Sequence, residues 1–96
     1  MKFVIEFNWS GGRMADEPDE IADELGYLLT LDAKAEADDV RSQMENIVWE
    51  RHPGSTVETD VVPVSHNVIA VPNGGQVGYL ITLIAKITVE IDYNFE

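Results

Sequence analysis

The feature that most constrains the fold is a long apolar alternation near the end of the chain. A helix would scatter these side chains around its circumference, whereas a strand places them on one face. The polar residues between them predict an antiparallel strand with one buried and one wet face. At about 3.3 Å per residue it would be on the order of 60 Å long, so it must bend or project. The alternating residues are Val77, Tyr79, Ile81, Leu83, Ala85, Ile87, Val89, Ile91, Tyr93 and Phe95.

A turn signal precedes this alternation and predicts its partner. The run Pro72-Asn73-Gly74-Gly75 supplies the positive φ angles that a tight hairpin needs. Residues 56–71 are therefore expected to fold back on residues 77–92. Pro63 cannot donate to a strand ladder, which predicts an edge strand that is bulged or broken near Val62 and Pro63.

Two further strands are predicted in the first third of the chain. Residues 2–9 alternate between apolar and polar side chains, which is typical of a half-buried strand. Residues 26–34 resemble residues 78–86 at an offset of 52, with seven of nine positions identical. We interpret this as a duplicated strand-loop-strand unit, so residues 27–35 are expected to form a strand. Chance similarity between two segments of biased composition is the alternative.

One helix is predicted between the two units. Asp38 or Asp39 can cap it, Val40, Met44, Ile47 and Val48 follow a helical spacing, and Pro53-Gly54 ends it. The predicted fold is a single α+β domain, residues 1–96, with a four-stranded mainly antiparallel sheet in ββαββ order. The helix, residues 39–52, packs on one face. One helix cannot cover four strands, so part of the apolar face would stay exposed, which predicts a twofold homodimer.

The charge of the chain excludes several partners. Eighteen Asp and Glu stand against six Lys and Arg, a net charge of −12. Phosphates and anionic membrane surfaces repel such a chain, so no direct nucleic-acid or membrane binding is expected. The absence of cysteine, of a signal peptide and of a long apolar run is consistent with a cytoplasmic protein, in the host cytoplasm if it is phage-encoded.

The most informative segment for function is an acidic connection after the first strand. If residues 18–25 form a short helix with Pro18 in its first turn and Gly26 just past its end, five carboxylates share one face. Carboxylates one turn apart rise about 5 to 6 Å, comparable to successive phosphates of a nucleic-acid strand. A solvated acidic loop that maintains solubility is the alternative. The candidate partner-binding residues are Asp16, Asp19, Glu20, Asp23, Glu24 and, as a possible interface anchor, Trp49.

Other patterns do not support catalysis. Ser10-Gly11-Gly12-Arg13 lacks the phosphate-loop pattern and is expected to be a flexible turn. His52 and His66 belong to no triad or ligand pair, and the acidic run lacks the glycine and trailing glutamate of a calcium loop. We therefore expect a non-enzymatic protein without metal or cofactor.

Two functional hypotheses remain. The first is an inhibitor or decoy, a nucleic-acid mimic of anti-CRISPR or anti-restriction type, whose carboxylates occupy a basic groove of a nucleic-acid-handling protein. The second is a structural or assembly module, such as a virion component, that forms a homo-oligomer through its long strand. In the second case the acidity would reflect solubility or halophilic adaptation. A dense carboxylate face would favour the decoy.

Overall fold

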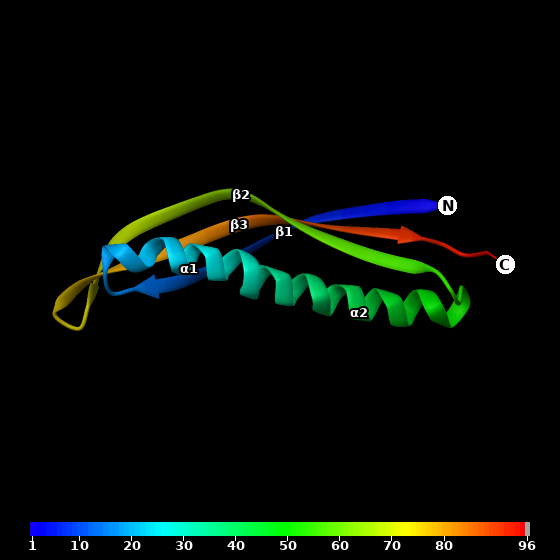
Figure 1. Cartoon of the computed structure of the whole chain (residues 1–96), viewed down its shortest axis with the longest axis horizontal. Coiled ribbons are helices and arrows are strands. Elements are labelled where there is room, and N and C mark those ends of the chain that lie inside the picture. Colours follow the sequence, from blue (N-terminus) through cyan, green and yellow to red (C-terminus); the bar gives the residue numbers. More distant parts are fainter. Residues whose placement is uncertain (96) are drawn as a thin grey trace.

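A single long helical segment lies along one face of a three-stranded sheet in the computed structural model, which describes residues 1–95 (Figure 1). The body is elongated, with extents of 62 × 20 × 16 Å. In chain order the elements are β1 (Lys2–Ala15), η1 (Pro18–Glu20), α1 (Ile21–Tyr27), the π-helical η2 (Leu28–Ala33), α2 (Lys34–Arg51), β2 (Thr56–Asn73) and β3 (Gln76–Asp92).

The sheet has the order β1-β3-β2, and both pairs of neighbours are antiparallel. The predicted hairpin is confirmed: β2 and β3 join through Gly74 and Gly75, whose φ angles are 58° and 85°. Positive φ at both central residues gives the turn the twist that flanking strands require. The long strand β3 therefore lies in the centre of the sheet, hydrogen-bonded on both of its edges.

The predicted irregularity near Pro63 is also confirmed. The β2–β3 register shifts between Pro63 and Ser65, so Val64 is an extra residue without a partner in β3. One inserted residue reverses which side chains point to each face. Odd-numbered residues of β2 face the helix before the shift, and even-numbered residues such as Val68 face it afterwards.

The predicted fourth strand is wrong. Residues 27–35, expected to be a strand by likeness to residues 78–86, belong to the helical segment. A helical spacing of apolar residues runs through the region and overrides the local likeness. Within the π-helical η2 both Leu28 and Leu29 pack on the sheet side, so the apolar stripe continues through this turn at spacings of three and four residues. The stripe consists of Ile21, Leu25, Leu28, Leu29, Ala33, Ala37, Val40, Met44 and Val48.

The helix boundaries also need correction. The helix was predicted at residues 39–52, whereas α2 begins at Lys34 and follows α1 and η2 without a break. Pro18 opens the first turn as expected, but Gly26 lies inside α1 and does not end the helix. A chain that buries its apolar stripe on a sheet tolerates the roughly 1 kcal/mol that an internal glycine costs.

Strand β1 is longer than the predicted 2–9. It continues to Ala15 through Ser10-Gly11-Gly12-Arg13, which is therefore not a flexible turn. The side chain of Trp9 explains Gly11, because its indole ring occupies the space that a Cβ atom at residue 11 would need. The glycine therefore serves close packing within a strand.

The core lies between the central strand and the helical stripe. Leu83, Ile87 and Ile91 of β3 are at most 3% exposed, so the helix covers the central strand. With three strands instead of four, one helix suffices to cover the middle strand. Part of the apolar helix-side face stays exposed, as expected, in the edge strand β1, where Phe3 is 48% and Ile5 is 43% exposed opposite Ile91 and Val89.

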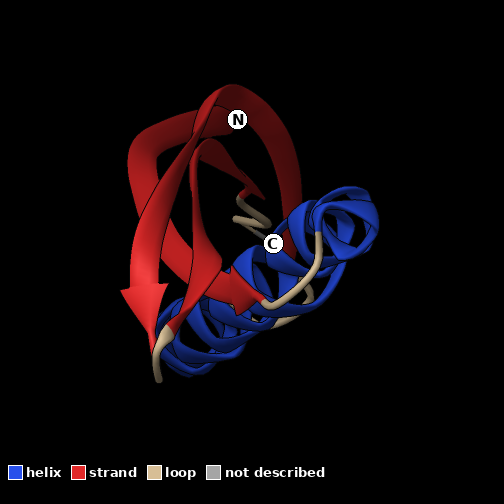
Figure 2. Ribbon diagram, turned by 90° about the vertical axis from the view of Figure 1, so that its left-hand side faces the viewer, coloured by secondary structure: helices blue, strands red, loops and turns tan. Residues whose placement is uncertain are grey.

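The helix crosses the sheet diagonally, because the sheet twists along its length while the helix runs nearly straight (Figures 1 and 2). At one end α1 and η2 pack over β1, and at the other α2 packs over β2. Each edge strand therefore has one covered half and one half beyond the helix. In β1 the uncovered half is the segment Lys2–Glu6, in which every residue is exposed.

Candidate functional site

The negative charge is concentrated on the helical layer. Residues 16–51 contain twelve acidic and three basic side chains, a net charge of −9. The other sixty residues contain six acidic and three basic side chains, a net charge of −3. Since the helix occupies one face of the sheet (Figure 2), this face of the molecule carries most of the negative potential.

Arg13 attaches the beginning of the helix to β1. Its Nε and Nη2 atoms donate to the two carboxylate oxygens of Asp32 at 2.8 Å each, and Nη1 donates to Glu24 at 3.3 Å. Its guanidinium also lies 5.5 Å from the ring centre of Tyr27. The hydrogen bonds from Arg13 hold the pKa of Asp32 below its ordinary value, and those with Asp32 raise the pKa of Arg13. This cluster is structural, because its charges already satisfy one another.

The predicted carboxylates therefore separate into two groups. Asp16, Asp19, Glu20 and Asp23 are exposed, whereas Glu24 is half-buried and paired with Arg13. Asp16 also accepts a hydrogen bond from the Asn73 side chain at 2.8 Å. Asp19 and Asp23 lie one turn apart, a rise of about 6 Å, so the predicted spacing along a helix is present.

The helix dipole favours these carboxylates. A helix that ended at Gly26 would place Asp23 and Glu24 at its negative end, but the helix does not end there. The helix continues to Arg51, so both residues lie in the first turn of α1. Carboxylates near a helix N-terminus are stabilised by the unpaired backbone N–H groups. Stability alone therefore accounts for part of the acidic run.

The helix carries further exposed carboxylates that sequence reasoning missed. Glu36, Asp39 and Glu50 are exposed on α2 and extend the acidic surface along the molecule. They were overlooked because residues 27–35 were assigned to a strand, which divided the acidic segment from α2. The helical spacing from Ile21 to Val48 was the signal that could have joined them.

Trp49 lies far from the first acidic turns. About 25 residues of helix separate it from Glu24, roughly 38 Å at 1.5 Å per residue. Its ring is 47% exposed and its indole N–H donates to the Ser55 carbonyl at 2.6 Å. The hydrogen bond fixes the ring beside the loop that leads into β2. The structure therefore does not bring Trp49 together with the carboxylates at the other end of the helix.

The two histidines occupy separate places. His52 lies in an aromatic cluster, with ring centres 5.4 Å from Tyr93 and 4.9 Å from Phe95, and Phe3 joins through Tyr93 at 5.3 Å. His66 is exposed on β2, opposite Leu83. The arrangement packs His52 against aromatic rings and leaves His66 on the exposed surface of β2.

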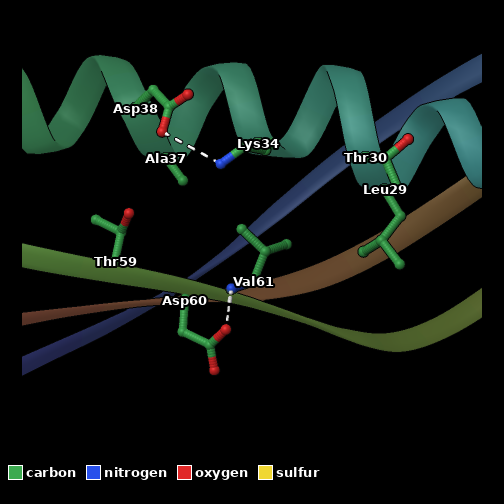
Figure 3. A pocket seen from close by; sticks show the side chains of 8 residues that line it. All are labelled: Leu29, Thr30, Lys34, Ala37, Asp38, Thr59, Asp60 and Val61. Atoms are coloured by element: carbon green, nitrogen blue, oxygen red, sulfur yellow. Dashed lines mark hydrogen bonds and ion pairs between the residues drawn. The ribbon is translucent and has the colours of Figure 1, made fainter.

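A hollow of about 330 Å³ lies between the helix and β2 (Figure 3). Thr59 and Val61 point from β2 toward the helix, whereas the Asp60 carboxylate turns away and accepts from the Val61 backbone N–H at 3.0 Å. Lys34 on the opposite wall pairs with Asp38 at 3.8 Å. The charged side chains that line the hollow, Lys34, Asp38 and Asp60, are thus each engaged in a contact within the chain.

Within residues 1–95, no group of three or more acidic, histidine or cysteine side chains is arranged to hold a metal ion. Over the same residues, no helix is long and apolar enough to cross a membrane. Comparison of the chain with protein-family models, curated proteins and solved structures finds no match in any of the three.

Proposed function

We propose that this chain is a non-enzymatic acidic binding protein whose helical layer occupies a basic groove of a nucleic-acid-handling protein. The supporting observation is the division of charge between the two layers, −9 over residues 16–51 against −3 over the rest. A dense carboxylate face is what a nucleic-acid mimic needs, whereas acidity that serves only solubility has no reason to favour one layer.

The shape of the molecule supports the same proposal. The body is 62 Å long and only 20 × 16 Å in cross-section, and a B-DNA duplex rises about 3.4 Å per nucleotide along its axis. An extended acidic rod can therefore follow a groove over several nucleotides' length. Exposed carboxylates at both ends of the helix, from Asp19 to Glu50, provide the contacts. CRISPR effectors and restriction nucleases are the partner class we propose.

The test is inhibition of DNA cleavage by a panel of purified CRISPR effectors and restriction nucleases, with excess duplex DNA as competitor. The key variant is Asp19→Asn/Asp23→Asn, which removes two exposed charges from α1 and its lead-in. Removing them should slow association and reduce its salt dependence, because charges facing a basic cleft act mainly on the association rate.

The matched control is Glu58→Gln/Asp60→Asn, which removes the same charge from β2. Asp60 points away from the helix (Figure 3), so this variant should inhibit as the native chain does. Equal effects of the two variants would show that net charge alone matters and would contradict a site on the helix. No inhibition of any enzyme in the panel would also contradict the proposal.

A second candidate function is a structural or assembly module. The observation that favours it is a long sheet with two exposed edges in a rod-shaped body. β3, the long strand on which this hypothesis relied, is paired on both sides. Any pairing between subunits therefore falls to β1 or β2.

A further inference from the structure

The two edges of the sheet differ in how they are protected against pairing with another strand. The uncovered half of β2 lies between Pro63 and Pro72 and contains the extra residue Val64. Proline, bulges and charged side chains are the usual devices that keep an edge strand from pairing. β1 contains no proline and no bulge, since its fourteen residues pair with β3 without a register shift. The charged residues of its uncovered half are Lys2 and Glu6, which have opposite signs.

The uncovered half of β1 also exposes apolar side chains on both faces. Phe3 and Ile5 point to the helix side, where they are 48% and 43% exposed, and Val4 on the other side is 59% exposed. The helix lies over the opposite half of this strand and does not cover these side chains (Figure 1). Phe3 packs edge-on against the Tyr93 ring and still stays about half exposed. Exposed apolar groups on an unprotected edge are where a strand is most readily added.

The hydrogen-bonding groups of this edge are available at alternate residues. The Met1 carbonyl accepts from the Tyr93 N–H at 2.9 Å, and Met1 stands opposite Tyr93 in the continued register. In an antiparallel pair such bonded residues alternate along the strand, so odd-numbered residues of β1 bond to β3. Even-numbered residues, including Lys2, Val4 and Glu6, direct their N–H and C=O groups to the free edge.

The residues at this edge are complementary to themselves. When Lys2-Phe3-Val4-Ile5-Glu6 is paired antiparallel with a second copy centred on Val4, Lys2 faces Glu6, Phe3 faces Ile5 and Val4 faces Val4. Every edge-directed residue then meets another edge-directed residue, as the ladder requires. β1 contains three charged residues, Lys2, Glu6 and Arg13. In every register that respects this alternation, an even-numbered residue faces an even-numbered one, so Arg13 cannot face Glu6. Only the register centred on Val4 therefore places opposite charges of β1 across from each other.

The neighbouring strand continues the charge pattern. Lys2 lies 3.0 Å from the Glu90 carboxylate, and Glu6 lies 3.7 Å from Lys86. Across the paired copies, neighbouring charges therefore alternate in sign. Lys86 and Glu6 of one copy are followed by Lys2 and Glu90 of the second copy. Lys2, one of the six basic side chains of a −12 chain, thus stands where two copies would meet, and Lys86 of β3 supports its partner Glu6 from behind. Opposite charges in cross-strand positions favour the pairing.

We propose that two copies of this chain associate through the Lys2–Glu6 segment of β1, related by a twofold axis at Val4, to form a continuous six-stranded sheet. In this arrangement Phe3 and Ile5 of each copy meet those of the other on the helix side. The interface is separate from the acidic helical layer, so the two proposals stand or fall independently.

The test is the dimer dissociation constant, measured by sedimentation velocity on the native chain and three variants. Lys2→Glu and Glu6→Lys should each weaken the dimer by about tenfold or more, because each places like charges across the axis twice. The double variant Lys2→Glu/Glu6→Lys should restore native affinity. A monomeric native chain at 100 μM concentration, or a double variant no tighter than the single ones, would overturn the proposal.

Crosslinking provides a second readout that does not depend on charge. The chain contains no cysteine, and residues facing one another in a bonded antiparallel pair have Cα atoms about 5.5 Å apart, within disulfide range. Val4→Cys should therefore form a covalent dimer on mild oxidation, and Asn8→Cys, on the same edge outside the paired segment, should not. Equal crosslinking of the two variants would contradict the register.

Discussion

Residues 26–34 and 78–86 share seven of nine amino acids, yet one segment is helical and the other is the centre of a sheet. Leu31 is 55% exposed in the helix, while the corresponding Leu83 is 3% exposed in β3. The difference shows that the apolar partners outside a segment decide its structure. Ile21 and Leu25 extend a helical stripe into the first segment, whereas the alternation from residue 77 to 91 extends a strand through the second.

The largest effect should come from truncating the same leucine in each segment. Leu83→Ala removes a buried side chain and should lower the free energy of unfolding by about 2 to 5 kcal/mol. Leu31→Ala removes an exposed one and should change it by less than about 0.5 kcal/mol. Urea titration followed by circular dichroism measures both, and similar losses would contradict the burial difference.

Alanine at the first glycine of each segment should act with opposite signs. At Gly78 a Cβ atom would lie 2.9 Å from the Cβ of Asn73 and 3.1 Å from the Met14 methyl, so Gly78→Ala should destabilise by about 1 to 3 kcal/mol. At Gly26 no atom lies within 4 Å of the added Cβ. Gly26→Ala should stabilise the helix by up to about 1 kcal/mol. Thermal unfolding of the two variants checks the signs, and a shared sign would weaken the comparison.

Making the two segments identical is the most direct way to break the comparison. Leu29→Ile/Asp32→Ile gives the first segment the sequence of the second. We expect the helical signal in far-ultraviolet circular dichroism to persist. The free energy of unfolding should fall by a few tenths of a kcal/mol per isoleucine, because isoleucine has a lower helix propensity, and further because the ion pair of Asp32 with Arg13 is lost. The control is Ile84→Asp, which makes the opposite change at the corresponding, exposed position of β3. Loss of the helical signal would show that local sequence decides.

The smallest expected effect concerns Asp32, which has Ile84 as its counterpart. Arg13 lowers the pKa of Asp32 in the folded protein, so the stabilisation is complete above the ordinary value of 3.8 and is lost as pH falls through the lowered value. The stability difference between the native chain and Asp32→Asn should thus shrink as pH falls from about 5 to 2. Asp23→Asn, outside the contacts of Arg13, is the control. A constant difference over this range would contradict the ion pair.

The sequence predicted the elements whose signals are local. The hairpin at Gly74 and Gly75, the strands it joins and the irregularity at Pro63 follow from turn chemistry and alternation. The prediction of a strand at 27–35 failed because identity with residues 78–86 was given more weight than the helical spacing from Ile21 onward. That spacing continues through the π turn at Leu28–Ala33, because Leu29 packs on the core four residues from both Leu25 and Ala33.

The candidate site was predictable only in part. The acidic run at residues 16–24 was visible in the sequence, but the pairing of Glu24 with Arg13 depends on a strand that sequence reasoning ended at residue 9. The exposed half of β1 could not be foreseen, because it follows from the twist that carries the helix from β1 to β2. The position of β1 at the edge of the sheet likewise depends on the strand order β1-β3-β2, which no local sequence pattern indicates.

The central place of β3 also fixes the order of events during synthesis. Both other strands pair only with β3, and β3 is translated after them. About 41 residues separate the end of α2 from the end of β3, roughly 2 to 8 s at 5 to 20 residues per second. Throughout that interval the nascent helix has no sheet to cover, and β1 has no neighbour. The ribosome therefore holds an unfinished chain whose first strand is free to meet other nascent copies, and only the last strand closes the fold.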